Sequence, residues 1–145
     1  MKNSTNQHLY FAYGSNLDHV QMAFRCPGAT PVGAAHIEGW RFRIYERGYA
    51  TITQSPKHVV WGGLWNVSDE NLEALDRYEG VASGLYLRTT LPVTTADGLV
   101  EAIVYVAEHN RDDVPSSSYA ERVVAGAEWF ELPSNYVAEI TEVMA

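Results

Sequence analysis

The sequence has a single cysteine, Cys26, among its 145 residues, so no intramolecular disulfide bond can form. Such sparse cysteine use is typical of proteins from a reducing cytosol, and we expect a cytoplasmic protein. A catalytic cysteine would need a lowered pKa. Only the neighbouring Arg25 favours a lowered pKa here, so we assign Cys26 no catalytic role.

Basic clusters and long apolar runs are also lacking. Contact with nucleic-acid phosphates needs clustered Lys and Arg, whereas this chain has a net charge of -8 and only Arg41, Arg43 and Arg47 come near one another. No apolar run approaches the roughly 20 residues of a membrane-spanning helix. The polar start "MKNSTNQH" lacks the apolar core of a signal peptide. We therefore expect neither nucleic acid nor a membrane as a partner.

The residues that are present indicate one globular domain. The chain is 46% hydrophobic and 19% charged, a composition typical of globular proteins, and its length suits one domain with a real core. It has no repeats and no linker-like stretches. We predict a single domain over residues 1–145, with "PVGAAH" (31–36) and "VPSSSY" (114–119) as loops within it.

Hydrophobic periodicity predicts mostly strands, with helices interspersed late. The predicted strands cover residues 9–14, 39–46, 49–54, 59–67, 85–95 and 99–108, the last two joined at Asp97-Gly98. The predicted helices cover residues 15–24, 69–79, 117–130 and 134–144, with Asn16, Ser68 and Ser134 as caps. In the first helix, Leu17, Val20 and Phe24 share a face. Gly62 and Gly63 indicate a bulge or a close backbone approach. This order predicts an α+β fold with a mixed, largely antiparallel sheet curled toward a barrel and a few flanking helices.

A carboxylate falls on the apolar side of the second helix, "DENLEALDRYE". If Leu72 is set at zero on a helical wheel, Leu75 lies near roughly 300° and Glu79 near roughly 340°. An isolated carboxylate is costly to bury and tends to raise its pKa, which suits general acid-base catalysis. A solvated last turn would give Glu79 no such role, and the helical wheel alone leaves both interpretations open.

The stretch "AYGSNL" runs from a predicted strand into a predicted helix. Such a junction presents unpaired backbone N–H groups, here those of Gly14, Ser15 and Asn16, and can bind an anion. It lacks the several glycines and the lysine of a phosphate loop, so a small carboxylate fits better than a triphosphate. An ordinary tight turn with an asparagine cap explains the same residues.

Five segments in order resemble the γ-glutamylcyclotransferase family, also described as AIG2-like: "LYFAYGSNL", "YATITQSP", "VVWGGLW", "LDRYEGVASGLY" and "PSSSY". They span roughly residues 9–120, and "GAEWFELPSNYVAEI" adds a fainter likeness. The resemblance implies that the α-amine of a γ-glutamyl substrate attacks its own γ-carbonyl, which yields 5-oxoproline and releases the amine or amino acid. It implies no cofactor and no metal, a small-molecule γ-glutamyl substrate and, since relatives are often dimers, a homodimer.

The resemblance also implies roles for named residues. Glu79 is the acid-base residue, and Tyr119 contacts the substrate from a covering segment. The residues that line the γ-glutamyl site are Tyr10, Phe11, Ala12, Tyr13, Gly14, Ser15 and Asn16, with Tyr86 as a pocket tyrosine. The amide groups of Gly14 to Asn16 hold either the α-carboxylate or the developing oxyanion.

Two departures from animal members leave the leaving group open. The stretch "EGWRFRIYERGYA" is shorter than its counterpart there, and the residues "DRY" before Glu79 differ. The leaving group is an amino acid, a polyamine, a protein lysine or part of a secondary metabolite. Glutathione is less favoured, because the enzymes dedicated to it look like a separate branch.

Other function classes have less support. A serine hydrolase would use Ser15, but no G-x-S-x-G motif is present. The five histidines, His8, His19, His36, His58 and His109, are scattered and form no pair at metal-ligand spacing. The main alternative is a non-catalytic γ-glutamyl binding module on the same fold, because fold does not determine function.

Overall fold

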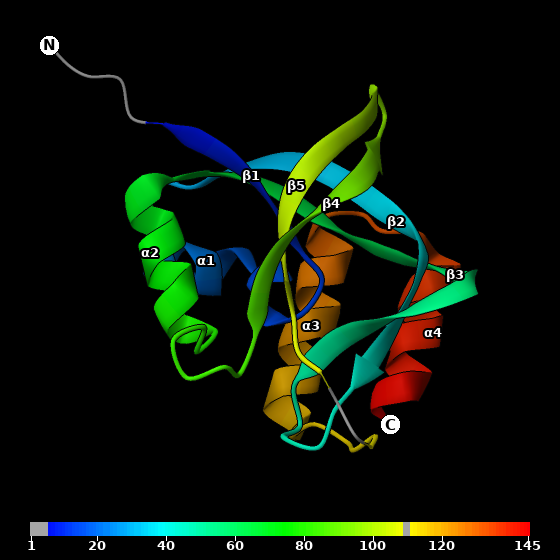
Figure 1. The fold of residues 1–145 in the computed structure, drawn as a ribbon. Helices are drawn as coiled ribbons and strands as arrows, with labels where there is room; N and C mark the ends of the chain where they lie inside the picture. The colour runs from blue at the N-terminus through cyan, green and yellow to red at the C-terminus, as the bar shows by residue number, and fades with distance from the viewer. Residues whose placement is uncertain (1–5, 109–110) are drawn as a thin grey trace, which may run out of the picture.

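The strands of the computed structural model, which describes residues 6–108 and 111–145, form a closed barrel (Figure 1). They are β1 (Gln7–Ala12), β2 (Thr30–Ile44), β3 (Ala50–Ser68), β4 (Leu87–Thr95) and β5 (Gly98–Val106). Their order around the barrel is β1-β3-β2-β4-β5. A parallel pairing of β1 with β5, at Tyr10 and Ile103, closes the barrel, and the other pairings are antiparallel. The predicted α+β fold with a barrel-like sheet is confirmed.

The long hairpin of β2 and β3 differs from the sequence prediction in two ways. Residues 49–54 and 59–67, predicted as two strands, are parts of the single strand β3. The segment 31–36, predicted as a loop, belongs to β2, where Ala34 and Ala35 pair with Gly63 and Gly62. Small residues on both strands allow this pairing, and a register shift beside Gly33 absorbs the irregularity. Pairing across the sheet outweighs the weak strand propensity of Gly and Ala.

The helices of the described residues flank the barrel. They are the short 3₁₀ helix η1 (Ser15–Leu17), α1 (His19–Arg25), α2 (Asp69–Tyr78), α3 (Ser117–Trp129) and α4 (Ser134–Met144). In Figure 1, α1 and α2 lie together at one side of the barrel and α4 lies at the opposite side. The helix α3 packs against η1 and α4. Among these helices, none is long and apolar enough to cross a membrane.

The first helix starts later than predicted. Asn16 is not its cap, because residues 15–17 form the 3₁₀ turn and Asp18 caps α1 by accepting the Val20 N–H at 3.3 Å. The new start changes the phase of the helix. Val20 and Phe24, predicted to face the core with Leu17, are 66% and 79% exposed, while Leu17 is fully buried. The predicted apolar face of this helix is therefore wrong.

The starts of the other helices agree with the sequence except at Ser134. Ser68 caps α2, as predicted, and it also forms a capping box with Asn71. Ser116 caps α3, so the last three residues of the predicted loop 114–119 are helical. Ser134 is the first residue of α4 rather than its cap, because Pro133 occupies the cap position and no side chain caps the helix.

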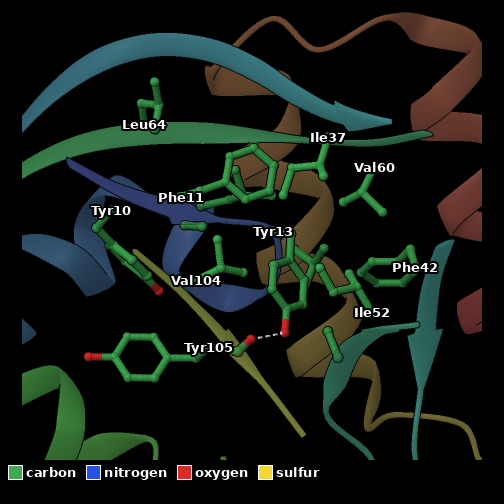
Figure 2. Packing of buried hydrophobic residues seen from close by; sticks show 14 of the residues in the cluster. Tyr10, Phe11, Tyr13, Ile37, Phe42, Ile52, Val60, Leu64, Val104 and Tyr105 are labelled. Atoms are coloured by element: carbon green, nitrogen blue, oxygen red, sulfur yellow. Dashed lines mark hydrogen bonds between the residues drawn. The ribbon is translucent and has the colours of Figure 1, made fainter. Parts of the chain in front are cut away.

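The barrel interior positions the end of β1. Its core includes Phe11, Ile37, Phe42, Ile52 and Val60 (Figure 2). Gly62 and Gly63 lie where other groups approach closely: a Cβ on Gly62 would clash with the Ala12 carbonyl oxygen, and one on Gly63 with the Phe130 ring. The strand register continues through both glycines, so the predicted close approach is correct and the bulge is not. Strand β1 therefore lies tightly on β3 up to the turn that starts η1.

Candidate active site

A cavity of about 480 Å³ lies beside the turn where β1 runs into η1. Its walls come from β1, η1, α1, the β2–β3 loop and the start of β3, the end of α2 and the segment after it, β5, and the start of α3. The predicted site residues that line it are Tyr10, Phe11, Tyr13, Gly14, Ser15, Asn16, Glu79, Tyr86 and Tyr119. Ala12 is not among the lining residues; it is buried and pairs with Gly63. Segments far apart in the sequence thus meet at one cavity.

Glu79 is held in place by the way α2 ends. It is the C-cap residue, and Gly80 follows with φ +65°, a conformation that glycine adopts without strain. The Gly80 N–H donates to the Arg77 carbonyl at 3.1 Å, and the Val81 N–H donates to the Asp76 carbonyl at 3.0 Å. These two bonds form a Schellman motif. The backbone of Glu79 is therefore fixed at a point where the residue lines the cavity.

The surroundings of Glu79 favour its neutral form more than water does. Leu72 and Leu75, its neighbours on the helical wheel, are buried, and Glu79 itself is half-buried. Burial raises the pKa of Glu79 to about 7, although the nearby Arg25 guanidinium lowers that pKa. The side chain is thus not the solvated group of the simpler interpretation. Near neutral pH it can both accept and release a proton.

Three buried tyrosines and the half-buried Tyr119 surround this carboxyl group. Burial raises the pKa of Tyr10, Tyr13 and Tyr86 well above its usual value, and the negative charge of Glu79 raises it further. The same causes raise the pKa of Tyr119 to about 12, although the amides of Ala50 and Ser15 lower it. All four hydroxyl groups therefore keep their protons at neutral pH and can donate hydrogen bonds.

Hydrogen bonds to the backbone orient these tyrosines. Ala50, the first residue of β3, accepts a bond from the Tyr86 hydroxyl at 2.7 Å and donates its N–H to the Tyr119 hydroxyl at 3.1 Å. A Cβ on Gly14 would lie 3.0 Å from the Tyr119 oxygen, so Gly14 leaves room for this ring. Figure 2 shows Tyr13 reaching the Tyr105 carbonyl, to which its hydroxyl donates at 2.5 Å.

Asn16 connects the η1 turn to α1. Its side-chain amide donates to the Tyr10 hydroxyl at 2.9 Å. Its side-chain oxygen accepts from Gln21 at 2.9 Å and from Arg25 at 3.2 Å. Gln21 also donates to the Ser15 hydroxyl at 2.7 Å. The buried Asn16 therefore serves as the centre of a polar network instead of as a helix cap.

Sequence reasoning missed about half of the cavity wall. Gln21 and Arg25 could have been found, because residues four apart on a helix share a face. The others come from the β2–β3 loop, the start of β3, α2, the segment between α2 and β4, β5 and α3, and no local pattern connects them to "AYGSNL". The missed lining residues are Gln21, Arg25, Arg47, Tyr49, Ala50, Tyr78, Leu85, Tyr105, Ser116, Ser118 and Arg122.

The described residues of the cavity give no support to a serine hydrolase, a metalloenzyme or a catalytic cysteine. Ser15 has its hydroxyl bonded to Gln21, and no histidine within residues 6–108 and 111–145 lines the cavity. His109 lies outside the described residues. Across the described chain, no group of three or more His, Cys, Asp or Glu is placed to hold a metal ion. Cys26 is buried outside the cavity, and burial raises its pKa to about 11.

Comparison with known proteins finds similarity to one family over most of the chain. A family model described as "AIG2-like family" matches residues 59–140. The chain is similar to gamma-glutamylcyclotransferases of Homo sapiens and Bos taurus, each 32% identical over 146 residues that cover 93% of this chain and 78% of the relative. A solved structure named gamma-glutamyl cyclotransferase matches with a TM-score of 0.89 and 30% identity, covering 97% of this chain and 89% of that one.

Proposed function

The chain belongs to the AIG2-like family of γ-glutamylcyclotransferases, and we propose that it cyclises a γ-glutamyl amino acid or amine to 5-oxoproline with Glu79 as the acid-base residue. The single observation that carries the role of Glu79 is its placement. A half-buried carboxyl group, with its pKa raised to about 7, lines the same cavity as the η1 turn.

In the first step, the Glu79 carboxylate accepts a proton from the α-ammonium group of the substrate. Such a group has a pKa of about 8, so the proton transfer costs little when the acceptor has a pKa of about 7. The freed amine attacks the γ-carbonyl carbon, and a five-membered ring forms with a negative charge on the carbonyl oxygen.

In the second step, the same carboxyl group returns the proton. Glu79 donates it to the leaving nitrogen, and the bond between that nitrogen and the γ-carbon breaks as the carbonyl forms again. The ring nitrogen, which still carries two hydrogens, gives one of them through Glu79 to the released amine, so the products are the neutral lactam of 5-oxoproline and the leaving group as an ammonium ion. The enzyme ends as it began. Since nucleophile and electrophile belong to one molecule, holding the substrate folded contributes up to roughly 7–11 kcal/mol of the barrier reduction.

The cavity offers hydrogen-bond donors for the two negatively charged groups of the reacting substrate, its α-carboxylate and the oxyanion that forms at the γ-carbonyl. The amide groups of Gly14 to Asn16 form the start of a 3₁₀ helix and lack partners within it. We assign them to the α-carboxylate or the oxyanion, with the neutral Tyr119 hydroxyl beside them. Donors fixed before the reaction stabilise developing charge without reorganisation.

The test is 5-oxoproline release from a panel of γ-glutamyl amino acids and amines. We expect Glu79→Gln to lower kcat by roughly 10²–10⁴-fold, the usual contribution of a general acid-base group. The control is Glu73→Gln, because Glu73 is exposed on the same helix and lies outside the cavity. Unchanged release by Glu79→Gln would refute the mechanism. No release by the unaltered protein from any member of the panel would support a binding module instead.

A further inference from the structure

The cavity is electropositive in an otherwise acidic protein. Among the described residues that line it, Arg25, Arg47 and Arg122 are basic and only Glu79 is acidic. The whole chain has 10 Lys and Arg against 18 Asp and Glu, and a net charge of -8. A concave site with an excess of one sign of charge concentrates ligands of the opposite sign. The cavity therefore favours a substrate with more than one carboxylate.

Two of these arginines are already engaged by the protein. Arg122 lies 3.5 Å from a carboxylate oxygen of Asp18 and donates to the Gln21 side chain at 2.9 Å. Arg25 donates to Asn16, and its guanidinium lies 4.4 Å from the centre of the Tyr78 ring. Both arginines brace the network around η1. An α-carboxylate bound there would be next to Glu79, on which the charge of Arg25 acts.

Arg47 differs from the other two. It is exposed, and within residues 6–108 and 111–145 no side chain forms a hydrogen bond or ion pair with it. The β2–β3 turn nevertheless fixes the backbone position of Arg47. The Gly48 N–H donates to the Tyr45 carbonyl at 2.8 Å, and the Tyr45 N–H donates to the Tyr49 carbonyl at 3.0 Å. With Gly48 at φ +81°, this is a compact three-residue hairpin turn.

The turn that carries Arg47 also packs against the start of α3. The Tyr49 ring meets Tyr119 edge to face, with 5.4 Å between ring centres, and Ser116 and Ser118 line the same cavity. Arg47 is thus a cation at the solvent-exposed edge of the cavity that pairs with no side chain among the described residues. The leaving half of the substrate must pass through such an edge to depart, whereas the α-carbon must stay beside Glu79.

We propose that Arg47 determines the specificity for the leaving group by binding a carboxylate on it, an inference that rests on the proposed function. The leaving half would then be an amino acid, whose carboxylate lies two bonds from the leaving nitrogen. Polyamines and protein lysines bring positive charge, or none, to the same place, and like charges disfavour binding there. Arg25 and the η1 amides take the α-carboxylate, and Arg47 takes the second one.

The test compares γ-glutamyl-alanine with γ-glutamyl-ethylamine, which is the same substrate without the leaving-group carboxylate. We expect the unaltered enzyme to have the higher kcat/KM for γ-glutamyl-alanine. Arg47→Gln should lower the ratio of the two kcat/KM values roughly tenfold, mainly through the KM for γ-glutamyl-alanine. Arg47→Lys keeps the charge and should restore part of the ratio. Arg41→Gln is the control, because Arg41 is exposed on β2 outside the cavity, and it should leave the ratio unchanged.

The outcomes separate this inference from the proposed function. If the unaltered enzyme releases 5-oxoproline from both substrates without preference, or if Arg47→Gln slows both equally, the role of Arg47 is wrong and the cyclisation stands. If neither substrate is turned over, the proposed function fails. Calorimetric binding of γ-glutamyl-alanine then still tests Arg47, because equal affinities of the unaltered protein and Arg47→Gln would overturn its role.

Discussion

Replacing Glu79 with Gln should make the protein more stable at neutral pH while it slows the proposed chemistry. The folded state raises the pKa of this carboxyl group from 4.5 to about 7, mainly through burial. Between these two pH values the folded protein binds more protons than the unfolded chain, so the free energy of unfolding falls as the pH rises. The raised pKa lowers the free energy of unfolding by about 3 kcal/mol at about pH 7 and above. Below about pH 4 it has no effect on that free energy.

The assay is urea denaturation of the unaltered protein and of Glu79→Gln at pH values from 4 to 8.5. Any pH-independent effect of the amide adds a constant, and the other titrating groups are common to both proteins and cancel. The stability difference should therefore grow by about 3 kcal/mol in favour of the variant as the pH rises. Glu73→Gln, on the exposed side of α2, is the control. A difference that stays constant over this pH range would show that the folded state does not raise the pKa of Glu79.

Three further predictions concern the surroundings of the site. Gly80→Ala should cost about 1–2 kcal/mol of stability, because Gly80 has φ +65° and a Cβ there would lie 3.0 Å from Leu85. Urea denaturation measures this loss. The release of 5-oxoproline should also fall, because the substitution moves Glu79. Glu131→Gly should gain up to about 1 kcal/mol of stability, because Glu131 follows Phe130, the C-cap residue of α3, and has φ 59°, which glycine adopts without strain. An unchanged unfolding midpoint would contradict this argument. Cys26, fully buried with its pKa raised to about 11, should resist a thiol reagent at pH 8 until urea unfolds the protein, and mass spectrometry of the native protein would reveal an early reaction.

Local patterns predicted those parts of the site that depend on neighbours in the sequence. The carboxylate of Glu79 could be placed because α2 is a regular helix with a good cap at Ser68 and a glycine after its end. Two buried leucines then define the inward direction. The junction between β1 and η1 could also be predicted from the sequence, because Gly14 follows a short apolar strand.

The secondary-structure predictions were wrong where a local irregularity interrupts the regular spacing of apolar residues along the chain. The 3₁₀ turn at residues 15–17 moves the cap from Asn16 to Asp18, so the helical wheel for α1 had the wrong phase and placed Val20 and Phe24 inside. In β2 the small residues at 33–35 resembled a loop. Their partners in β3, which no local pattern identifies, make them a strand.

The rest of the cavity depends on contacts between distant segments. Arg122 reaches Gln21 across 101 residues of sequence, and the Tyr119 hydroxyl meets the Ala50 amide across 69. Both contacts come from α3, which packs against η1. A single sequence carries no signal for such contacts, so Arg47 could be noted as a charge but not assigned to the cavity wall.

The most direct test of the central claim is a titration of Glu79 itself. Carbon-13 NMR of protein labelled at the glutamate side-chain carboxyl carbons would follow every glutamate, and the resonance missing from Glu79→Gln identifies the relevant one. We predict a titration midpoint at about pH 7 for this resonance. A midpoint near the ordinary value of 4.5 would mean that the group is ionised throughout the neutral range, and it would contradict the role of Glu79 as the carrier of the proton between the two nitrogens.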